Sequence, residues 1–378
     1  MLKLKFKILI LAVVAFTSAL FFTKSVVFAS EKSLTVIVGN KKYEFYDYEI
    51  GFYNNKYFLK NATDIADGIF LDTIIKPVDS QVIFDDNGEF YLTSSKNGKQ
   101  IDKDTLLKDI SYALNNDIST VKAKFKTTHP LVTKKALESQ TILRSSFTTY
   151  FPYSSAERKS NIRLASSKIN GVKIAKNQEF SFNKTVGART EENGFKIAKV
   201  ILDGAYIDGV GGGVCQVSST LYNTAILSGL QITEHHSHSL PVSYVEPSFD
   251  AMVNSGTSDL RFVNNTDSDI YISAYADNEK ITIKFYGLKQ TESYERVSVV
   301  TNTILPDSPL EVLDDTIPLG EKVMVEKPQN GLESEGYLIK YSNGVRVNTY
   351  KIRSDKYKAV RGKVLIGTNT TLAIDNNL

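Results

Sequence analysis

Cys215 is the residue whose type and surroundings point most directly to chemistry, because it is the only cysteine among 378 residues. It follows three glycines at 211–213 and precedes a segment, 216–230, whose apolar residues recur at helical spacing. The sequence therefore predicts that Cys215 lies at the start of a helix. Backbone amides and the helix dipole stabilise a thiolate there, and the amides of Cys215 and Gln216 are placed to stabilise an oxyanion. This setting favours a nucleophilic thiol.

A proton acceptor for such a thiol is available downstream. Three of the four histidines, His235, His236 and His238, form a cluster, while His129 is isolated. Apolar and β-favouring residues on both sides predict an extended strand through the cluster. On a strand, His236 and His238 point to one face and His235 to the other. One of the first two is therefore expected to be the base, and the sequence leaves open which.

Other interpretations of these residues are less favourable. A free cysteine is most often a small buried apolar residue, but in an exported protein an idle thiol is an oxidation liability. Glu234, His236 and His238 would share one strand face, yet consecutive ligands on one strand diverge, so a metal site is disfavoured. The glycine run lacks the Gly-Lys-Ser/Thr ending of a phosphate-binding loop. We expect no metal and no cofactor.

The N-terminal segment indicates export. Lys3, Lys5 and Lys7 precede an uncharged apolar run at 8–22, and small residues near 27–29 suit a signal peptidase. The run is shorter than the roughly 20 residues that span a bilayer, although apolar residues resume at 26–28. Residues 1–29 are thus predicted to be a signal peptide or an N-terminal membrane anchor. The remainder is expected to be extracytoplasmic, in the cell wall or on the outer face of the cytoplasmic membrane.

The overall charge argues against nucleic acid as a partner. Lys and Arg total 45 against 42 for Asp and Glu, a net charge of +3 that is too small for a surface that follows phosphates. A single cysteine also excludes an internal disulfide. The function classes that remain are those of exported proteins that act on wall polymers, peptides, surface partners or lipids.

Composition along the chain predicts an α+β protein of several domains. Residues 33–128 combine short strands with one helix, capped by Asp102 or Asp104, and form a small α+β module. Residues 129–145 are expected to be a linker. Residues 146–287 form a mixed α+β domain with a helix at 160–169, and 288–378 form an all-β module with Pro and Gly breaks.

The block at 211–223, which reads Gly-Gly-Gly-Val-Cys-Gln-Val-Ser-Ser-Thr-Leu-Tyr-Asn, resembles the VanW domain. The similarity extends to His-Ser-His-Ser at 236–239 and Asp-Leu-Arg-Phe at 259–262, and covers about 147–286. The N-terminal module resembles the peptidoglycan-binding domain that often precedes VanW domains. The C-terminal module is similar to the G-five (G5) domain, which is associated with cell-wall sugars, but it has few of the usual glycines.

The resemblance implies a peptidoglycan L,D-transpeptidase, in which Cys215, deprotonated by His236 or His238, forms a thioester with a stem peptide. Gly213, Gln216 and Ser218 lie in the motif and are expected to orient the thiol or contact substrate. The implied partners are stem peptides and glycan strands.

Three residues further along the resemblance are candidates for supporting roles. Arg189 and Arg261 are suited to hold donor carboxylates, since a guanidinium grips one with two parallel hydrogen bonds. Structural ion pairs are an equal alternative for both arginines. Asp259 is a candidate to orient the catalytic histidine, by analogy with other triads.

Two alternatives remain open at this stage. Water, rather than an amine, would resolve the same thioester in an L,D-carboxypeptidase or endopeptidase of the wall. A non-catalytic cell-wall-binding protein would instead use the flanking modules for contact and the middle domain as scaffold. That interpretation leaves the thiol behind three glycines unexplained.

Overall fold

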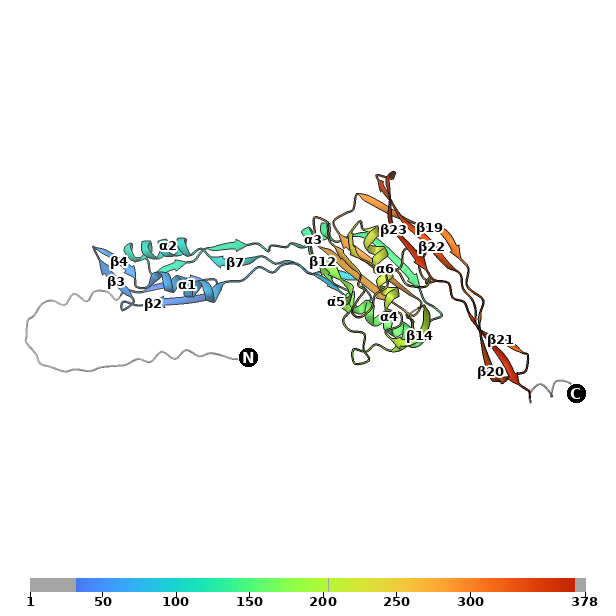
Figure 1. Cartoon of the computed structure of the whole chain (residues 1–378). Coiled ribbons are helices and arrows are strands. Elements are labelled where there is room, and N and C mark those ends of the chain that lie inside the picture. Colours follow the sequence, from blue (N-terminus) through green and yellow to red (C-terminus); the bar gives the residue numbers. More distant parts are fainter. Residues whose placement is uncertain (1–31, 203, 371–378) are drawn as a thin grey trace, which may run out of the picture. The chain divides into compact units, whose positions relative to one another are not determined.

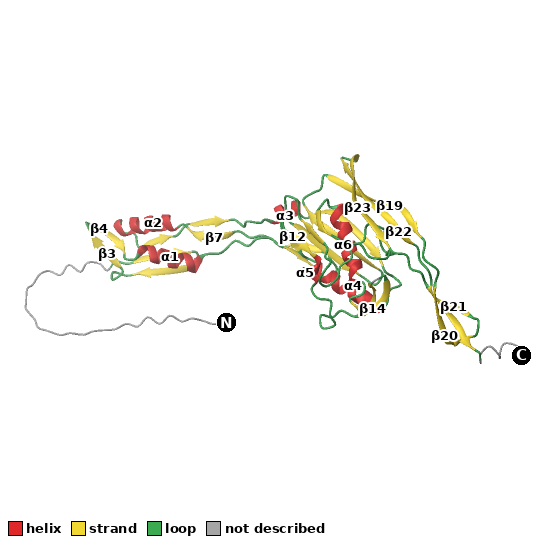
Figure 2. Cartoon of the chain, in the orientation of Figure 1, coloured by secondary structure: helices red, strands yellow, loops and turns green. Residues whose placement is uncertain are grey.

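The computed structural model describes residues 32–202 and 204–370, so the predicted leader at 1–29 lies outside the described residues. The described residues are 19% helix and 43% strand, which confirms the α+β class (Figure 2). The described residues divide into two compact units, 32–76 with 99–128, and 77–98 with 129–202 and 204–370. Within the described ranges, no helix has the length and apolar character needed to cross a bilayer.

The first unit is built on a three-stranded sheet of order β2-β1-β8. Its helix α2 begins after Asp102, whose side chain accepts a hydrogen bond from the Thr105 amide at 3.2 Å, and buries Leu106, Ile110 and Leu114, so the expected helix and cap are confirmed. The elements are β1 Leu34–Val38, β2 Lys41–Phe45, β3 Ile50–Tyr53, β4 Lys56–Leu59, α1 Ala62–Thr73, β7 Gly98–Ile101, α2 Lys103–Asn115, β8 Thr120–Lys122 and β9 Phe125–Thr128.

The central domain of the second unit, from β10 to β18, is a helix pair on a sheet of order β10-β18-β17-β11. Helices α4 and α6 pack against each other and against this sheet (Figure 1). The elements are β10 Ile142–Tyr150, α4 Ala156–Ile169, β11 Lys173–Ile174, β12 Glu179–Ser181, α5 Phe182–Val186, β13 Ile197–Leu202, β14 Ala205–Val210, α6 Val214–Leu227, β15 Gln231–Glu234, β16 Arg261–Val263, β17 Ile270–Ala276 and β18 Lys280–Gly287.

Side-chain alternation explains how this sheet holds its helices. Ile281, Ile283 and Phe285 of β18 are fully buried, and the intervening residues are more exposed, as expected for a sheet that buries one face. Helix α4 starts earlier than the predicted 160–169 because the Ser155 side chain accepts a hydrogen bond from the Arg158 amide at 3.2 Å. The helix pair and the sheet thus form one hydrophobic core.

Residues 77–98 pack with the second unit, although they lie in the range predicted for the N-terminal module. They form the hairpin of β5 Val82–Phe84 and β6 Phe90–Leu92. Asn170 donates to the Asp85 carbonyl at 2.8 Å, and the rings of Phe90 and Tyr286 meet edge to face at 4.8 Å. The predicted linker at 129–145 contains α3 Lys134–Gln140 and the first residues of β10.

The C-terminal domain, residues 288–370 as described, consists of strands and loops. Its first sheet, of order β19-β22-β23, packs on the central domain: Arg296 donates to Asn223 of α6 at 2.6 Å, and Ser298 donates to the Pro247 carbonyl at 2.7 Å. The second sheet has the order β20-β24-β21. The elements are β19 Glu292–Ile304, β20 Leu310–Pro318, β21 Lys322–Glu326, β22 Gly331–Ser342, β23 Val345–Tyr357 and β24 Lys363–Asn369.

Candidate active site

The start of α6 places Cys215 on a tightly packed helix terminus. Gly213 caps the helix at φ 107°, in the left-handed region that favours glycine. A Cβ atom at Gly213 would lie 3.0 Å from both Arg158 Cγ and Ile162 Cγ1 of α4. Gly213 therefore lets the two helices approach closely, which is its positioning role. The prediction that Cys215 begins a helix is confirmed, with Val214 as the first helical residue.

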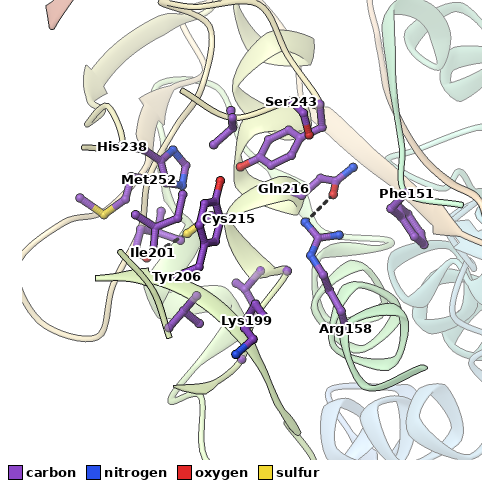
Figure 3. A pocket seen from close by; sticks show the side chains of 18 of the residues that line it. Phe151, Arg158, Lys199, Ile201, Tyr206, Cys215, Gln216, His238, Ser243 and Met252 are labelled. Atoms are coloured by element: carbon purple, nitrogen blue, oxygen red, sulfur yellow. Dashed lines mark hydrogen bonds between the residues drawn. The ribbon is translucent and has the colours of Figure 1, made fainter. Parts of the chain in front are cut away.

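The Cys215 sulfur is half-buried and lines a cavity of about 970 Å³ (Figure 3). Its thiol donates to the Val253 carbonyl at 3.3 Å, and both Cys215 and His238 line the cavity. Figure 3 shows the His238 ring and the sulfur on the same side of the cavity. The sulfur is thus accessible from the cavity and has an imidazole beside it.

His238 connects the sulfur to a buried carboxylate. Its Nδ1 and its backbone amide each lie 2.7 Å from Asp250 Oδ2, which leaves Nε2 for the sulfur. The two side chains are 6% and 1% exposed. Cys215, His238 and Asp250 therefore form a series of thiol, imidazole and carboxylate in which Asp250 is hydrogen-bonded to the ring beside the sulfur, the arrangement that activates a nucleophile and orients its base.

The electrostatics of this series favour a thiolate and an imidazolium. Desolvation raises the pKa of Cys215, but the hydrogen bond and charge of His238 outweigh it and bring this pKa below its ordinary value. Desolvation lowers the pKa of His238, but Asp250 and Cys215 raise it to about 9. At neutral pH the sulfur is therefore suited to attack and the imidazole to donate a proton.

The polar side of α6 holds the segment that carries Asp250. Ser218 donates to the Ala251 carbonyl at 2.5 Å, and Ser219 accepts from the Ala251 amide at 2.9 Å. Asn223 donates to the Phe249 carbonyl at 2.8 Å. All three side chains are buried. Ser218 therefore contributes by holding backbone rather than by facing the cavity.

The expected strand through the histidine cluster is wrong, because β15 ends at Glu234 and residues 235–238 form a loop. His236 faces Glu234, with Nε2 3.0 Å from Oε1, while His238 faces Cys215. His235 stacks on Tyr222 at 5.6 Å, and burial, with the charge of Arg353, lowers its pKa to about 4. The three rings thus diverge.

Asp259 does not orient His238, and Asp250 occupies that position. Asp259 accepts hydrogen bonds from Ser181 Oγ at 2.6 Å and from the Asn183 amide at 2.8 Å, so it caps the start of α5. Arg261 lies within 3.3 Å of carboxylate oxygens of Glu179, Glu234 and Asp259 and is absent from the cavity lining. The geometry therefore supports structural ion pairs, rather than substrate binding, as the role of Arg261.

One of the two amides expected to stabilise an oxyanion, that of Gln216, already has an acceptor. The Gln216 amide donates to the Gly213 carbonyl at 3.0 Å, and its side chain bonds Thr149 and Arg158 at 3.0 and 2.8 Å. The Gln216 side chain therefore holds the start of α6 against Thr149 and Arg158. The Cys215 amide has no backbone acceptor outside the helix among the described residues, which leaves it as the donor nearest the sulfur.

Cationic side chains dominate the charged part of the cavity. Arg158 and Arg189 line it beside Cys215, and within the described ranges neither has a carboxylate partner. Arg158 instead donates to Ser154 and Gln216, and Arg189 donates to Asn183 at 2.5 Å. The other charged lining residues that are described are Lys199, Lys356 and Lys358, and no described lining residue is acidic.

Sequence reasoning missed Asp250 and Arg158. Asp250 stands between Phe249 and Ala251, and an acid flanked by apolar residues is a signal of a buried, paired carboxylate. Arg158 precedes Ile162 by one helical turn, on the face of α4 expected to be buried. Both signals are visible in the sequence, but neither identifies the residue that pairs with Asp250 or with Arg158.

The structure brings together no other ligand set of note. Among residues 32–202 and 204–370, no group of three or more His, Cys, Asp or Glu side chains is arranged to hold a metal ion. Glu234 and His236 pair with each other while His238 turns to Asp250 and Cys215, so the three do not converge.

Three family models match the chain. Residues 157–286 match the family described as VanW like protein, 295–369 match the G5 domain, and 37–122 match the family described as "Putative peptidoglycan binding domain". The first match contains Cys215, His238 and Asp250. The models therefore agree with the resemblance found in the motif residues.

Two curated proteins are similar to the central domain. "Uncharacterized protein YoaR" of Bacillus subtilis is 42% identical over 141 residues, which are 37% of this chain and 46% of that protein. "Vancomycin B-type resistance protein VanW" of Enterococcus faecalis is 27% identical over 144 residues, 36% of this chain and 52% of that protein. The chain thus spans about half the length of each relative.

The three matches follow one another along the chain, with the VanW-like match between the other two. Cys215, His238 and Asp250 lie in the middle match, between the match to the putative peptidoglycan binding domain and the match to the G5 domain. The chain carries a VanW-like domain, preceded by a peptidoglycan-binding domain and followed by a G5 domain.

Proposed function

We propose that the protein is a peptidoglycan L,D-transpeptidase that cross-links stem peptides through an acyl group carried on Cys215. The observation that supports this most directly is the series Cys215–His238–Asp250 at the wall of an open cavity. A thiol with a lowered pKa, an imidazole and a buried carboxylate are the parts that acyl transfer needs. The wall-associated domains supply the substrate class.

The cavity suits a donor that carries carboxylates. Arg158 and Arg189 face it without carboxylate partners in the described residues, and their guanidinium groups are held by Gln216 and Asn183. A stem peptide that ends in D-alanine has a free carboxylate one residue beyond the bond to be cut. We assign Arg158 and Arg189 to hold that carboxylate, since a fixed guanidinium binds one with two hydrogen bonds.

In the first half-reaction, the Cys215 thiolate attacks the carbonyl carbon of the third stem residue. A carbon–sulfur bond forms, and the oxyanion accepts a hydrogen bond from the Cys215 amide. The amide bond to the terminal D-alanine then breaks, and the His238 imidazolium gives its proton to the departing amine. The products are free D-alanine, a thioester on Cys215 and a neutral imidazole.

In the second half-reaction, the amine of a neighbouring stem attacks the thioester carbonyl. Neutral His238 takes a proton from the attacking amine, a new amide bond forms and the carbon–sulfur bond breaks. Thiolate and imidazolium are restored, and Asp250 remains ionised throughout, because the charge and hydrogen bonds of His238 keep its pKa below its ordinary value against desolvation.

The test uses the full-length protein with disaccharide tetrapeptides. Intact-mass measurement should show a thioester adduct on the parent protein, and chromatography with mass spectrometry should show cross-linked dimers. Cys215→Ala is the matched control and should give neither. Adduct with shortened monomers only would replace the transferase with the carboxypeptidase or endopeptidase, and absence of adduct and product would leave the non-catalytic wall-binding protein.

A further inference from the structure

The carboxylate of Asp250 is held from two sides, and one side belongs to the C-terminal domain. On the central-domain side, Oδ2 accepts both hydrogen bonds from His238. On the other side, Oδ1 accepts a hydrogen bond from the Tyr357 hydroxyl at 2.6 Å. Tyr357 is the last residue of β23 and is 1% exposed. The C-terminal domain therefore reaches the reactive series directly.

Arg353, four residues earlier on β23, makes a second contact with Asp250. Its Nη1 donates to the Asp250 carbonyl oxygen at 2.6 Å, and its Nη2 lies 3.7 Å from Asp250 Oδ1. Asp355 fixes the guanidinium through two hydrogen bonds, at 2.6 and 2.9 Å. Arg353 is 7% exposed, so this is a buried and oriented contact rather than a surface ion pair.

The neighbouring backbone is clamped by the same sheet. Tyr357 Oη also accepts from the Ser248 amide at 2.8 Å, and Ser248 Oγ lies 2.7 Å from Ser334 Oγ of β22. A Cβ atom at Gly336 of β22 would lie 2.9 Å from the Ser248 carbonyl oxygen. The segment that carries Asp250 therefore lies between α6 and the C-terminal sheet.

We infer that β23 is part of the reactive centre, with Tyr357 and Arg353 as positioning residues that aim Asp250 at His238, so that the reactivity of Cys215 depends on the C-terminal domain. This inference rests on the proposed function. It assigns to the G5 domain a role inside the site, in addition to any contact with the wall. Tyr357 fixes the carboxylate so that Oδ2, rather than Oδ1, meets the imidazole.

Removal of the Tyr357 hydroxyl would leave Oδ1 buried without its donor, which is costly. Arg353 Nη2, 3.7 Å from Oδ1, is the cation that would then compete with His238, and the carboxylate would turn toward it and away from His238. The imidazolium would then be less well supported, and less of Cys215 would be ionised.

Several other charged or titratable groups face this series. The groups that face the sulfur are Arg158 of α4, Arg189 and Tyr244. The groups that face Asp250 are Tyr222 of α6, His235 and Asp355 of β23. The designed changes leave all six in place, so a changed pH profile reports on the carboxylate.

The test measures the rate of iodoacetamide alkylation of the full-length protein against pH, by intact mass. Because Cys215 is the only cysteine, each adduct reports on one sulfur. Tyr357→Phe should slow alkylation at pH 6 by roughly 3- to 10-fold, the range for one lost hydrogen bond in a buried network. Tyr341→Phe removes a tyrosine–carboxylate hydrogen bond to Glu295 in the same sheet and should leave the profile unchanged.

A double-mutant cycle separates positioning from general packing. In an Asp250→Asn background, Tyr357→Phe should change alkylation by less than about 1.5-fold, because its effect passes through the carboxylate. A full Tyr357→Phe effect in that background, or a parental profile for the folded single variant, would overturn the inference. An unchanged profile for Asp250→Asn alone would overturn the proposed function as well.

Discussion

Two histidine–carboxylate pairs lie close together in the sequence, and their surroundings differ sharply. His238 and Asp250 are 6% and 1% exposed and 2.7 Å apart, with the Cys215 sulfur beside the ring. His236 and Glu234 are 37% and 33% exposed and 3.0 Å apart, and Arg261 places a guanidinium beside Glu234. The same residue types therefore form a reactive series in one place and a solvated ion-pair cluster in the other. Burial and the neighbouring sulfur make the difference.

The largest effect should separate the two histidines. His238→Ala should lower the rate of cross-linking by about 10³-fold or more, because it removes both the proton donor and the counter-ion of the thiolate. His236→Ala should stay within about 3-fold of the parent, because its ring meets Glu234 instead of the sulfur. Rates of dimer formation from tetrapeptides measure both. Equal losses in the two variants would contradict the comparison.

The pH dependence of alkylation should sharpen the same contrast. The pKa of Cys215 is lowered and that of His238 is raised to about 9, so the two shifts favour the thiolate–imidazolium pair below about pH 9. Alkylation of the parent should therefore persist at pH 6. In His238→Ala the thiol loses its counter-ion, and the rate at pH 6 should fall by roughly 10-fold or more. His236→Ala should follow the parent curve.

The arginines provide a smaller contrast. Arg158→Gln and Arg189→Gln should each raise the KM for tetrapeptide donor by about 10-fold, because each loses a guanidinium that faces the cavity without a carboxylate partner in the described residues. Arg261→Gln should leave KM unchanged, since its charge is already balanced by Glu179, Glu234 and Asp259. A KM effect in Arg261→Gln would return it to the substrate-binding candidates.

The smallest effect concerns stability. Glu234→Gln should change the free energy of unfolding by less than about 1 kcal/mol, the usual value for an exposed ion pair. Asp250→Asn should destabilise the second unit by about 2 kcal/mol, because buried donors lose their charged acceptor. Hydrogen exchange of α6 peptides in a urea series compares the two. A larger loss for Glu234→Gln would show that burial is not what distinguishes the pairs.

The nucleophile and its helix could be predicted from sequence because the signals are local. The glycines at 211–213, Cys215 and the apolar spacing that follows all lie within a few turns of one another. The strand expected at 235–238 was wrong. Alternation of apolar residues in one segment carries no information on where its partner strand ends, and β16 pairs with β15 only as far as Glu234. Asp250 was missed because no local pattern records its pairing with His238, 12 residues upstream in a loop, or with Tyr357, 107 residues downstream in β23.

The domain order was also accessible from the sequence, whereas the packing between domains was not. The α+β class and the three families follow from composition and motifs. The meeting of β23 with Asp250 depends on a tertiary contact between residues 107 positions apart, and no local pattern records it.

The hydroxyl and amide side chains that α6 turns away from the cavity have a consequence for any mutational survey of this protein. Ser218, Ser219 and Asn223 never meet the cavity contents, yet they fix the loop that aims the acid. Substitutions at these three positions would abolish the proposed cross-linking while the Cys215 sulfur stays in place. A screen that scores growth alone would count these scaffold residues as catalytic residues. Chemical labelling of the Cys215 thiol would distinguish the two groups.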